Sequence, residues 1–294
     1  MTVGVALRLL AVMVLWASCF PLITIGLDLA PHLAFAAMRA VLAGLCLIGL
    51  GILFRRPVPQ GAYSWALVAL VGFGSTSLGF LGMFHAAEFV SPGLATVIAN
   101  TQPILAAILA YAFLGERLRA IGKAGLMTGL AGIAAIALPG LAVGDIPGYT
   151  LGIAYVVLAA TGVSVGNIAI KRLTGQVDAI MAMGFQLLIG AVPLALLSML
   201  TEDLSLLVWS TEFTLILVTL SVLGTSLAFW LWFSALEKVS LNRANAFTFL
   251  VPIFGLVIGA VLFDERLAWI QAAGVVLVVA GIMLVQRDAR ETRL

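Results

Sequence analysis

Long apolar stretches recur along the whole chain, and each is bounded by charged residues, proline or glycine. Each is close to the ~20 residues that a helix needs to cross the hydrocarbon core of a bilayer. Only a helix satisfies its own backbone hydrogen bonds within such a stretch, so the pattern predicts an all-α integral membrane protein with ten transmembrane helices. The predicted helices cover about 4–27, 32–54, 64–86, 93–114, 120–139, 149–170, 179–200, 212–235, 244–263 and 268–286.

The composition agrees with this pattern. The 294 residues are 63% hydrophobic and only 10% charged, whereas about a quarter of a soluble domain is charged. The first apolar stretch lacks a strong basic region and an Ala-x-Ala site, so we expect it to be a retained helix and not a cleaved signal peptide. The net charge of +2 is too small to indicate a nucleic-acid partner.

Lysine and arginine are distributed unevenly between alternate loops. Cytoplasmic loops carry the excess of these residues in membrane proteins. With the N-terminus in the cytoplasm, 13 of the 15 basic residues are cytoplasmic, Arg266 lies outside, and Arg39 lies within a helix. An even number of helices then predicts that both termini are cytoplasmic. The 13 are Arg8, Arg55, Arg56, Arg117, Arg119, Lys123, Lys171, Arg172, Lys238, Arg243, Arg287, Arg290 and Arg293.

The second half of the chain repeats the first. A shift of 149 residues aligns 76–133 with 225–282 without a gap, and 21 of these 58 positions are identical. Upstream the match is looser, and Arg39 falls near Gln186. Because five helices are an odd number, the second copy would lie upside down in the membrane. We therefore expect two inverted five-helix repeats, 1–143 and 144–294, an architecture that opens one binding site to alternate sides.

Four motifs carry a family resemblance: Trp16-Ala17-Ser18, Arg39, Pro103 with the later Gly115-Glu116-Arg117-Leu118, and Asp264-Glu265-Arg266-Leu267. With these motifs the chain resembles the drug/metabolite transporter superfamily and, more narrowly, its ten-helix EamA-type exporters, over essentially its whole length. The YddG-like aromatic amino-acid exporters are the most similar in character. The resemblance implies a multi-pass protein of the bacterial inner membrane, with a central cavity, that exports amino acids or similar small metabolites by alternating access.

Two ionisable side chains are candidates for the cavity. Arg39 lies about seven residues into its helix, roughly 10 Å along the axis. A guanidinium cannot lose its charge, so Arg39 either contacts a substrate carboxylate or braces the helices by donating to carbonyls. His85 is either a hydrogen-bonding cavity residue or an interfacial histidine in water. His32 is the only other histidine, and no cluster of ligands surrounds either residue, so no metal is expected.

Neutral polar and aromatic side chains within the predicted helices complete the expected cavity. A polar group in hydrocarbon is costly unless it is paired, so these groups should face the protein interior. Aromatic rings could stack on an apolar substrate, or simply pack or face lipid. The expected cavity residues are Trp16, Ser18, Arg39, His85, Asn100, Gln102, Ser164, Asn167, Gln186, Trp230, Phe233 and Thr248.

Pro103 and Pro252 occupy equivalent positions in the two repeats. Proline removes a backbone hydrogen bond, so we expect kinks in helices 93–114 and 244–263, which are either gates or purely structural features. Gly125-x-x-x-Gly129 and Gly255-x-x-x-Gly259 allow close helix packing within a monomer or across a homodimer.

Motifs that are absent from the sequence argue against ATP as the energy source and against other functional classes. No phosphate-binding loop is present, so neither ATP nor another cofactor is expected. The resemblance implies a secondary transporter whose partners are membrane lipids and a small-molecule substrate, namely amino acids, including aromatic and other apolar ones, or similar metabolites. A drug transporter would need a buried carboxylate, and a nucleotide-sugar transporter would need a basic cavity. An integral-membrane enzyme would need a catalytic constellation, which we do not find.

Overall fold

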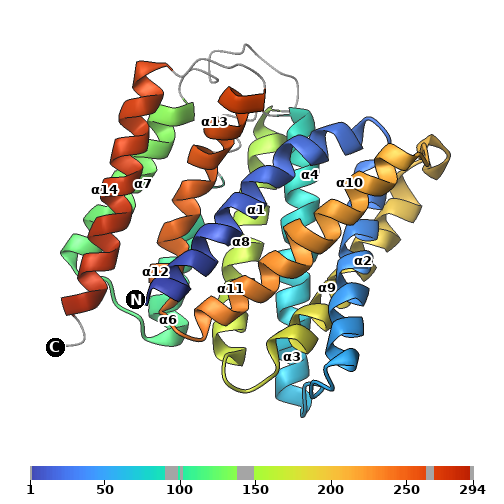
Figure 1. Ribbon diagram of the computed structural model, residues 1–294, viewed down its shortest axis with the longest axis horizontal. Helices are drawn as coiled ribbons and strands as arrows, with labels where there is room; N and C mark the ends of the chain where they lie inside the picture. The colour runs from blue at the N-terminus through green and yellow to red at the C-terminus, as the bar shows by residue number, and fades with distance from the viewer. Residues whose placement is uncertain (1, 90–98, 100–101, 138–148, 263–267, 292–294) are drawn as a thin grey trace.

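The chain folds into a bundle of helices in a computed structural model that describes residues 2–89, 99, 102–137, 149–262 and 268–291 (Figure 1). No β-strand occurs within these ranges. The elements are α1 (Val3–Leu27), α2 (His32–Leu53), α3 (Ala62–Val71), η1 (Gly72–Leu78), α4 (Gly79–Phe89), α6 (Gln102–Leu114), α7 (Ala120–Ala137), α8 (Tyr149–Leu173), α9 (Ala179–Thr201), η3 (Leu204–Leu206), α10 (Thr211–Ser221), η4 (Val222–Leu227), α11 (Ala228–Leu236), α12 (Leu241–Asn245), η5 (Ala246–Phe249), α13 (Leu250–Leu262) and α14 (Trp269–Glu291).

Seven helical stretches of the described residues are long and apolar enough to cross a membrane. Two shorter apolar helices, Gln102–Leu114 and Ala120–Ile136, accompany them. The prediction of an all-helical membrane protein is therefore confirmed for this part of the chain. The seven stretches are Val3–Leu27, His32–Leu53, Ala62–Ala86, Thr150–Leu173, Ala179–Thr201, Thr211–Leu236 and Trp269–Asp288.

Two predicted helices contain a wider turn that the apolar pattern did not reveal. The segments η1 and η4 are π-helical and follow α3 and α10 without a break. In η4 the hydroxyls of Thr225 and Ser226 donate to the carbonyls of Leu220 and Ser221, each five residues earlier, at 2.9 Å. These bonds satisfy carbonyls of the widened turn, and π-helical turns of this kind often mark functional sites.

Two other predicted ranges also differ from the structure. The helix predicted over 244–263 begins earlier, at Leu241, and is 3-10 helical from Ala246 to Phe249. The predicted tail after Gln286 is helical as far as Glu291. The added turn of α14 packs on the start of α7, where the Asp288 carboxylate accepts the backbone N–H of Arg119 at 3.3 Å.

Glycines bring two pairs of helices into close contact. A Cβ atom at Gly44 of α2 would lie 2.9 Å from the carbonyl oxygen of Gly184 in α9. The α7–α14 pair has two such contacts: Gly125 meets Gly281 and Gly132 meets Gly274, at 2.8 and 2.7 Å by the same measure. In the second pair, higher numbers on α7 contact lower numbers on α14, so these two helices run antiparallel.

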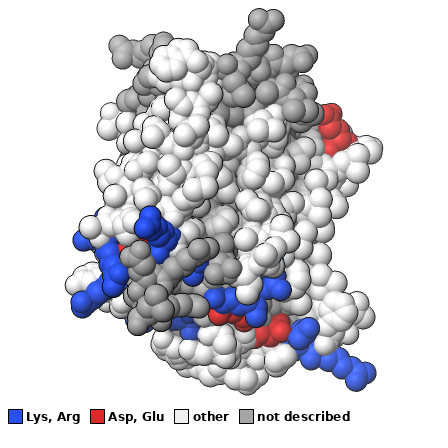
Figure 2. Space-filling model, turned by 60° about the vertical axis from the view of Figure 1, so that its left-hand side comes forward, with Lys and Arg blue, Asp and Glu red and all other residues white. Residues whose placement is uncertain are grey.

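Lys and Arg side chains of the described residues gather at one end of the bundle. Helix α1 begins and α14 ends at the same end, the lower one in Figure 1. Figure 2, which keeps the same vertical axis, shows Lys and Arg side chains gathered toward that end, while most of the surface above carries neither acids nor bases. We call it the basic end.

Candidate functional site

Arg39 is a buried cation, and no carboxylate of the described residues forms an ion pair with it. Its side chain is 5% exposed, and its Nε donates to the Thr225 hydroxyl at 2.8 Å. One terminal nitrogen lies 3.5 Å from the Cys19 sulfur, and the guanidinium lies 5.0 Å from the centre of the Phe80 ring. Among the described residues these partners are all neutral, so the guanidinium retains both its charge and unused N–H donors.

Gln186 occupies the position that corresponds to Arg39 in the second half. Its Oε1 accepts a hydrogen bond from the Thr76 hydroxyl at 2.9 Å, and Thr76 is the repeat equivalent of Thr225. The Gln186 Nε2 is buried and has no partner among the described atoms. The sequence placed Gln186 only near Arg39, whereas the structure gives both residues the same relation to a threonine in a π-helical segment.

The residues that follow the two threonines repeat the pattern. Ser77 donates to the carbonyl of Gly190 at 2.8 Å, and the hydroxyl of its equivalent Ser226 lies 2.9 Å from the carbonyl of Ala43, which shares the single proton with the carbonyl of Ser221. Each hydroxyl thus connects a π-helical segment to a helix of the other half. The Thr-Ser pair was visible in the repeat alignment, but its contacts were not.

Trp16 packs with aromatic residues of α11. Its ring lies 5.4 Å from Trp232 and 6.4 Å from Phe229, centre to centre. Trp232 in turn donates its Nε1–H to the Asn167 Oδ1 at 2.9 Å, which satisfies that buried amide oxygen. Phe233 is fully buried in the same apolar core. Two of the predicted cavity residues, Trp16 and Asn167, are therefore in contact with Trp232, an aromatic residue that the sequence also offered for stacking on a substrate.

Ser164 and Gln102 meet between α8 and α6. The Ser164 hydroxyl lies 2.7 Å from the Ala160 carbonyl and 3.3 Å from the Gln102 carbonyl. The Gln102 Nε2 is buried without a hydrogen-bond partner among the described atoms, directly before Pro103. Asn100, also expected in the cavity, lies outside the described residues.

A second buried amide lies where the chain changes helix type. The Thr248 hydroxyl donates to the Asn245 carbonyl at 2.7 Å, and the 3-10 segment around it ends shortly before Pro252. The Asn245 side chain is 1% exposed, and neither its oxygen nor its nitrogen has a described partner. We did not predict Asn245, because the sequence alone does not show that this turn is buried.

His85 and Ser18 have local partners. The His85 Nδ1 lies 3.2 Å from the Leu81 carbonyl, and its ring lies 5.1 Å from Tyr155 and 6.1 Å from His32, centre to centre. The Ser18 hydroxyl donates to the Val14 carbonyl of its own helix at 2.9 Å. Because that bond satisfies it locally, Ser18 is partly exposed and does not need to face the interior as we expected.

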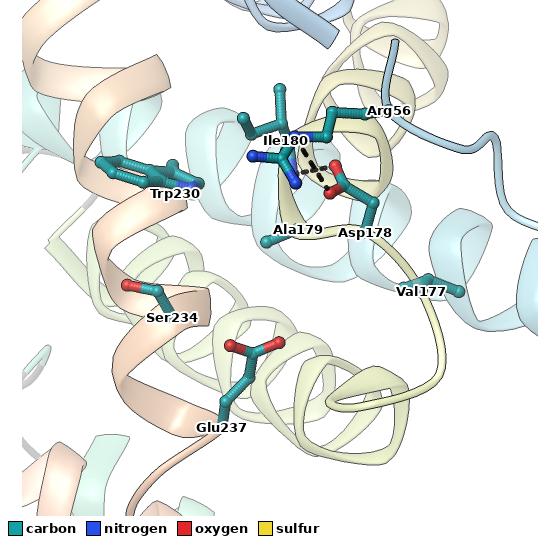
Figure 3. A pocket seen from close by; sticks show the side chains of 8 residues that line it. All are labelled: Arg56, Val177, Asp178, Ala179, Ile180, Trp230, Ser234 and Glu237. Carbon is teal, nitrogen blue, oxygen red and sulfur yellow. Dashed lines mark hydrogen bonds and ion pairs between the residues drawn. The ribbon is translucent and has the colours of Figure 1, made fainter. Parts of the chain in front are cut away.

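A pocket of about 310 Å³ opens at the basic end, between the start of α9 and α11 (Figure 3). Trp230 is the predicted cavity residue that lines it, and the other predicted residues do not. Around the tryptophan are three charged side chains that the sequence did not group together. The lining residues are Arg56, Val177, Asp178, Ala179, Ile180, Trp230, Ser234 and Glu237.

These features are suited to binding a ligand rather than to catalysing a reaction. Within the described ranges, no group of three His, Cys, Asp or Glu side chains is placed to hold a metal ion. The buried donors of Arg39, Gln102 and Gln186 can bind an anionic or carbonyl oxygen.

Known proteins match the chain over most of its length. The model of the EamA-like transporter family matches residues 3–138 and again 150–287. A "Probable amino-acid metabolite efflux pump" of Salmonella typhimurium is 30% identical over 96% of each chain. A WAT1-related chloroplastic protein of Arabidopsis thaliana is 29% identical over 85% of this chain, and the match spans 61% of that relative's length.

One solved crystal structure shares the fold, with a TM-score of 0.82, full coverage of both chains and 23% sequence identity. The two family matches cover nearly the whole apolar sequence, and the family consists of membrane transporters. The chain therefore belongs to the EamA-like transporter family and is a multi-pass membrane transporter for small molecules, not an enzyme.

Proposed function

We propose that the protein is a secondary transporter that exports amino acids, including aromatic and other apolar ones, or similar small metabolites. The observation that carries this proposal is Arg39, a buried guanidinium whose partners among the described residues are all neutral. A substrate carboxylate would supply the missing negative charge through charge-assisted hydrogen bonds. The name of the Salmonella relative points to the same substrate class.

We propose alternating access between two inverted repeats, 1–143 and 144–294, with ten membrane-crossing helices. The glycine contacts of α7 and α14 support it. Gly125 is the repeat equivalent of Gly274, and Gly132 is that of Gly281. If each glycine is replaced by its repeat equivalent, the Gly125–Gly281 contact becomes the Gly132–Gly274 contact. A two-fold axis that relates α7 to the antiparallel α14 would produce this pair of contacts.

In this mechanism, the hydrogen bonds of Arg39 and Gln186 are contacts between the moving halves. Arg39 belongs to the first repeat and Thr225 to the second, while Thr76 belongs to the first and Gln186 to the second. Rocking of one repeat against the other would break these bonds and free the polar groups for substrate. We propose export as the direction because the Salmonella relative is named an efflux pump, and the positive-inside rule places the basic end at the cytoplasmic face of a bacterial inner membrane.

Flux into proteoliposomes tests the proposal. Purified protein should carry radiolabelled amino acids down a concentration gradient without ATP, and an imposed pH gradient would reveal proton coupling. An absence of flux across a broad panel of amino acids, from protein that remains folded, would refute it. Nucleotide sugars and cationic drugs, tested in the same vesicles, would identify the alternative substrate classes.

A further inference from the structure

The pocket of Figure 3 has one wall suited to an ammonium group. Trp230, Ser234 and Glu237 follow one another at i, i+4 and i+7 on α11, so they share a face of the helix. The Trp230 ring is 37% exposed, and the Ser234 hydroxyl donates to the Leu231 carbonyl at 2.9 Å, which leaves its lone pairs available. An aromatic face, a hydroxyl oxygen and a carboxylate are the groups that bind an organic cation.

The Glu237 carboxylate is available for such a ligand. It points from the end of α11 toward the start of α9 (Figure 3), and within the described ranges its side chain makes no hydrogen bond or ion pair. The charge of the nearby Lys171 ammonium interacts with Glu237, but Lys171 donates its hydrogen bonds to the carbonyls of Leu236 and Val239, so among the described residues the Glu237 oxygens accept no hydrogen bond.

The opposite wall offers donors for an anion. The Arg56 Nε lies 3.8 Å from the Asp178 Oδ2, and the other Asp178 oxygen accepts the backbone N–H groups of Ile180 and Met181. The Arg56 side chain is 51% exposed, and among the described residues its ion pair with Asp178 leaves its terminal N–H groups unused. Figure 3 shows the guanidinium and the Asp178 carboxylate facing each other across the pocket from Trp230.

We propose that this pocket binds a zwitterion in which a primary ammonium and an anionic group are joined to an apolar body. Glu237 and Ser234 bind the ammonium, Arg56 binds the anionic group, and Trp230 contacts the apolar part. A volume of about 310 Å³ is at the lower limit of small-molecule sites, roughly 300–1,000 Å³. A free apolar amino acid and a phosphatidylethanolamine headgroup share this chemistry. For the amino acid, the pocket is a loading site at the basic end, an inference that rests on the proposed function.

Binding measurements on the full chain test this site. In phosphatidylethanolamine-free detergent, calorimetry compares phenylalanine with phenethylamine, which lacks the carboxylate, and with phenylpropanoate, which lacks the ammonium. Phenylalanine should bind at least about tenfold more tightly than either analogue, because each analogue leaves one charged wall unpaired. The same titrations are repeated with protein that carries Arg39→Ala, so that binding at Arg39 does not contribute to the measured heat.

Two variants separate the walls. Glu237→Gln should weaken phenylalanine and phenethylamine but not phenylpropanoate, whereas Arg56→Gln should weaken phenylalanine and phenylpropanoate but not phenethylamine. Glu212→Gln and Arg55→Gln, which lie outside the pocket, are the matched controls and should bind phenylalanine as the wild type does.

Nanodiscs distinguish the two sources of the zwitterion. If phosphatidylethanolamine fills the pocket, the affinity for phenylalanine should be lower in phosphatidylethanolamine nanodiscs than in phosphatidylcholine nanodiscs. The Glu237→Gln protein should then retain less phosphatidylethanolamine than the wild type. The proposal is overturned if both pocket variants bind phenylalanine within twofold of the wild type and retain as much phosphatidylethanolamine. If the pocket binds phenylalanine but the protein carries no amino acid across the membrane, the proposed export function is refuted and the proposed pocket is not. If the protein transports amino acids but the pocket variants bind phenylalanine as the wild type does, only the proposed pocket is refuted.

Discussion

Arg39 in α2 and Thr225 in η4 are joined by a 2.8 Å hydrogen bond from the guanidinium Nε to the hydroxyl, across 186 residues of sequence. The equivalent bond in the other half joins Thr76 to Gln186 at 2.9 Å. The two bonds involve equivalent threonines but run in opposite directions, because Arg39 donates to the Thr225 hydroxyl whereas the Thr76 hydroxyl donates to the Gln186 oxygen. One half supplies a cation and the other a neutral amide, so the two positions differ in charge.

Arg39→Ala should reduce amino-acid transport by about 10- to 100-fold in kcat/KM, and Arg39→Lys should reduce it less. A hydrogen bond to a charged group contributes about 1.5–3 kcal/mol, and the lysine retains the charge but not the planar donor set. Initial rates of flux in proteoliposomes measure the effect, and thermal unfolding verifies that both variants fold. Wild-type rates in a folded Arg39→Ala protein would remove this residue from the substrate site.

The two threonines form a matched pair of variants. Thr225→Val should lower the free energy of unfolding by about 1.5–3 kcal/mol, because it removes a neutral partner from a buried guanidinium. Thr76→Val should lower it by only about 0.5–1.5 kcal/mol, since Gln186 is uncharged. Denaturant unfolding in detergent compares the two proteins, and equal losses would contradict the special role assigned to the charge.

Substitution by alanine should change the stability of the protein differently at two glycines of α2. Gly44→Ala places a methyl group 2.9 Å from the Gly184 carbonyl oxygen, so we expect a loss of about 1–3 kcal/mol in unfolding free energy. Gly49→Ala meets no atom within 4 Å and should be neutral or slightly stabilising, because alanine favours the helix. Thermal melts of the two purified variants measure the difference. Similar melting temperatures of the two variants would mean that α2 and α9 pack less closely than the 2.9 Å contact at Gly44 requires.

Glu116 should matter for the stability of the second half. Its carboxylate accepts the backbone N–H groups of Leu241 at 2.8 Å and Asn242 at 3.1 Å, which caps the start of α12 from another part of the chain. Glu116→Ala should therefore cost about 1–2 kcal/mol in unfolding free energy. The exposed Glu212 offers a control, and Glu212→Ala should change stability by less than about 0.5 kcal/mol. An equal effect of both substitutions would exclude the capping role.

The proposed orientation predicts which loops reach the outside of the cell. Gln60 and Gln176 follow α2 and α8, and Ser205 follows α9, which runs antiparallel to α2. A membrane-impermeant maleimide on whole cells should label Ser205→Cys but not Gln60→Cys or Gln176→Cys. Labelling of Gln60→Cys would contradict the cytoplasmic position of the basic end. The native Cys19 is buried, which limits its background labelling.

The sequence by itself determined that the chain is built of apolar membrane helices and that part of its second half repeats part of its first. Runs of about 20 apolar residues specify membrane helices because the backbone has no other partner in lipid. The repeat alignment paired Thr76 with Thr225 and Gly125 with Gly274, since identities at one constant shift need no knowledge of contacts. The isolated charge of Arg39 also stood out, because a cation within an apolar run is rare.

Only the tertiary structure decided what these residues touch. An apolar run specifies no rotation about its axis, so the sequence did not show that Trp232 would bind Asn167 or that Glu116 would cap α12. The π-helical turns and the burial of Asn245, whose side chain has no partner among the described atoms, depend on the neighbouring helices that enclose them. The pocket at Trp230 is formed by side chains from three separate segments, because folding brings Arg56, Asp178 and Glu237 together at one end of the bundle.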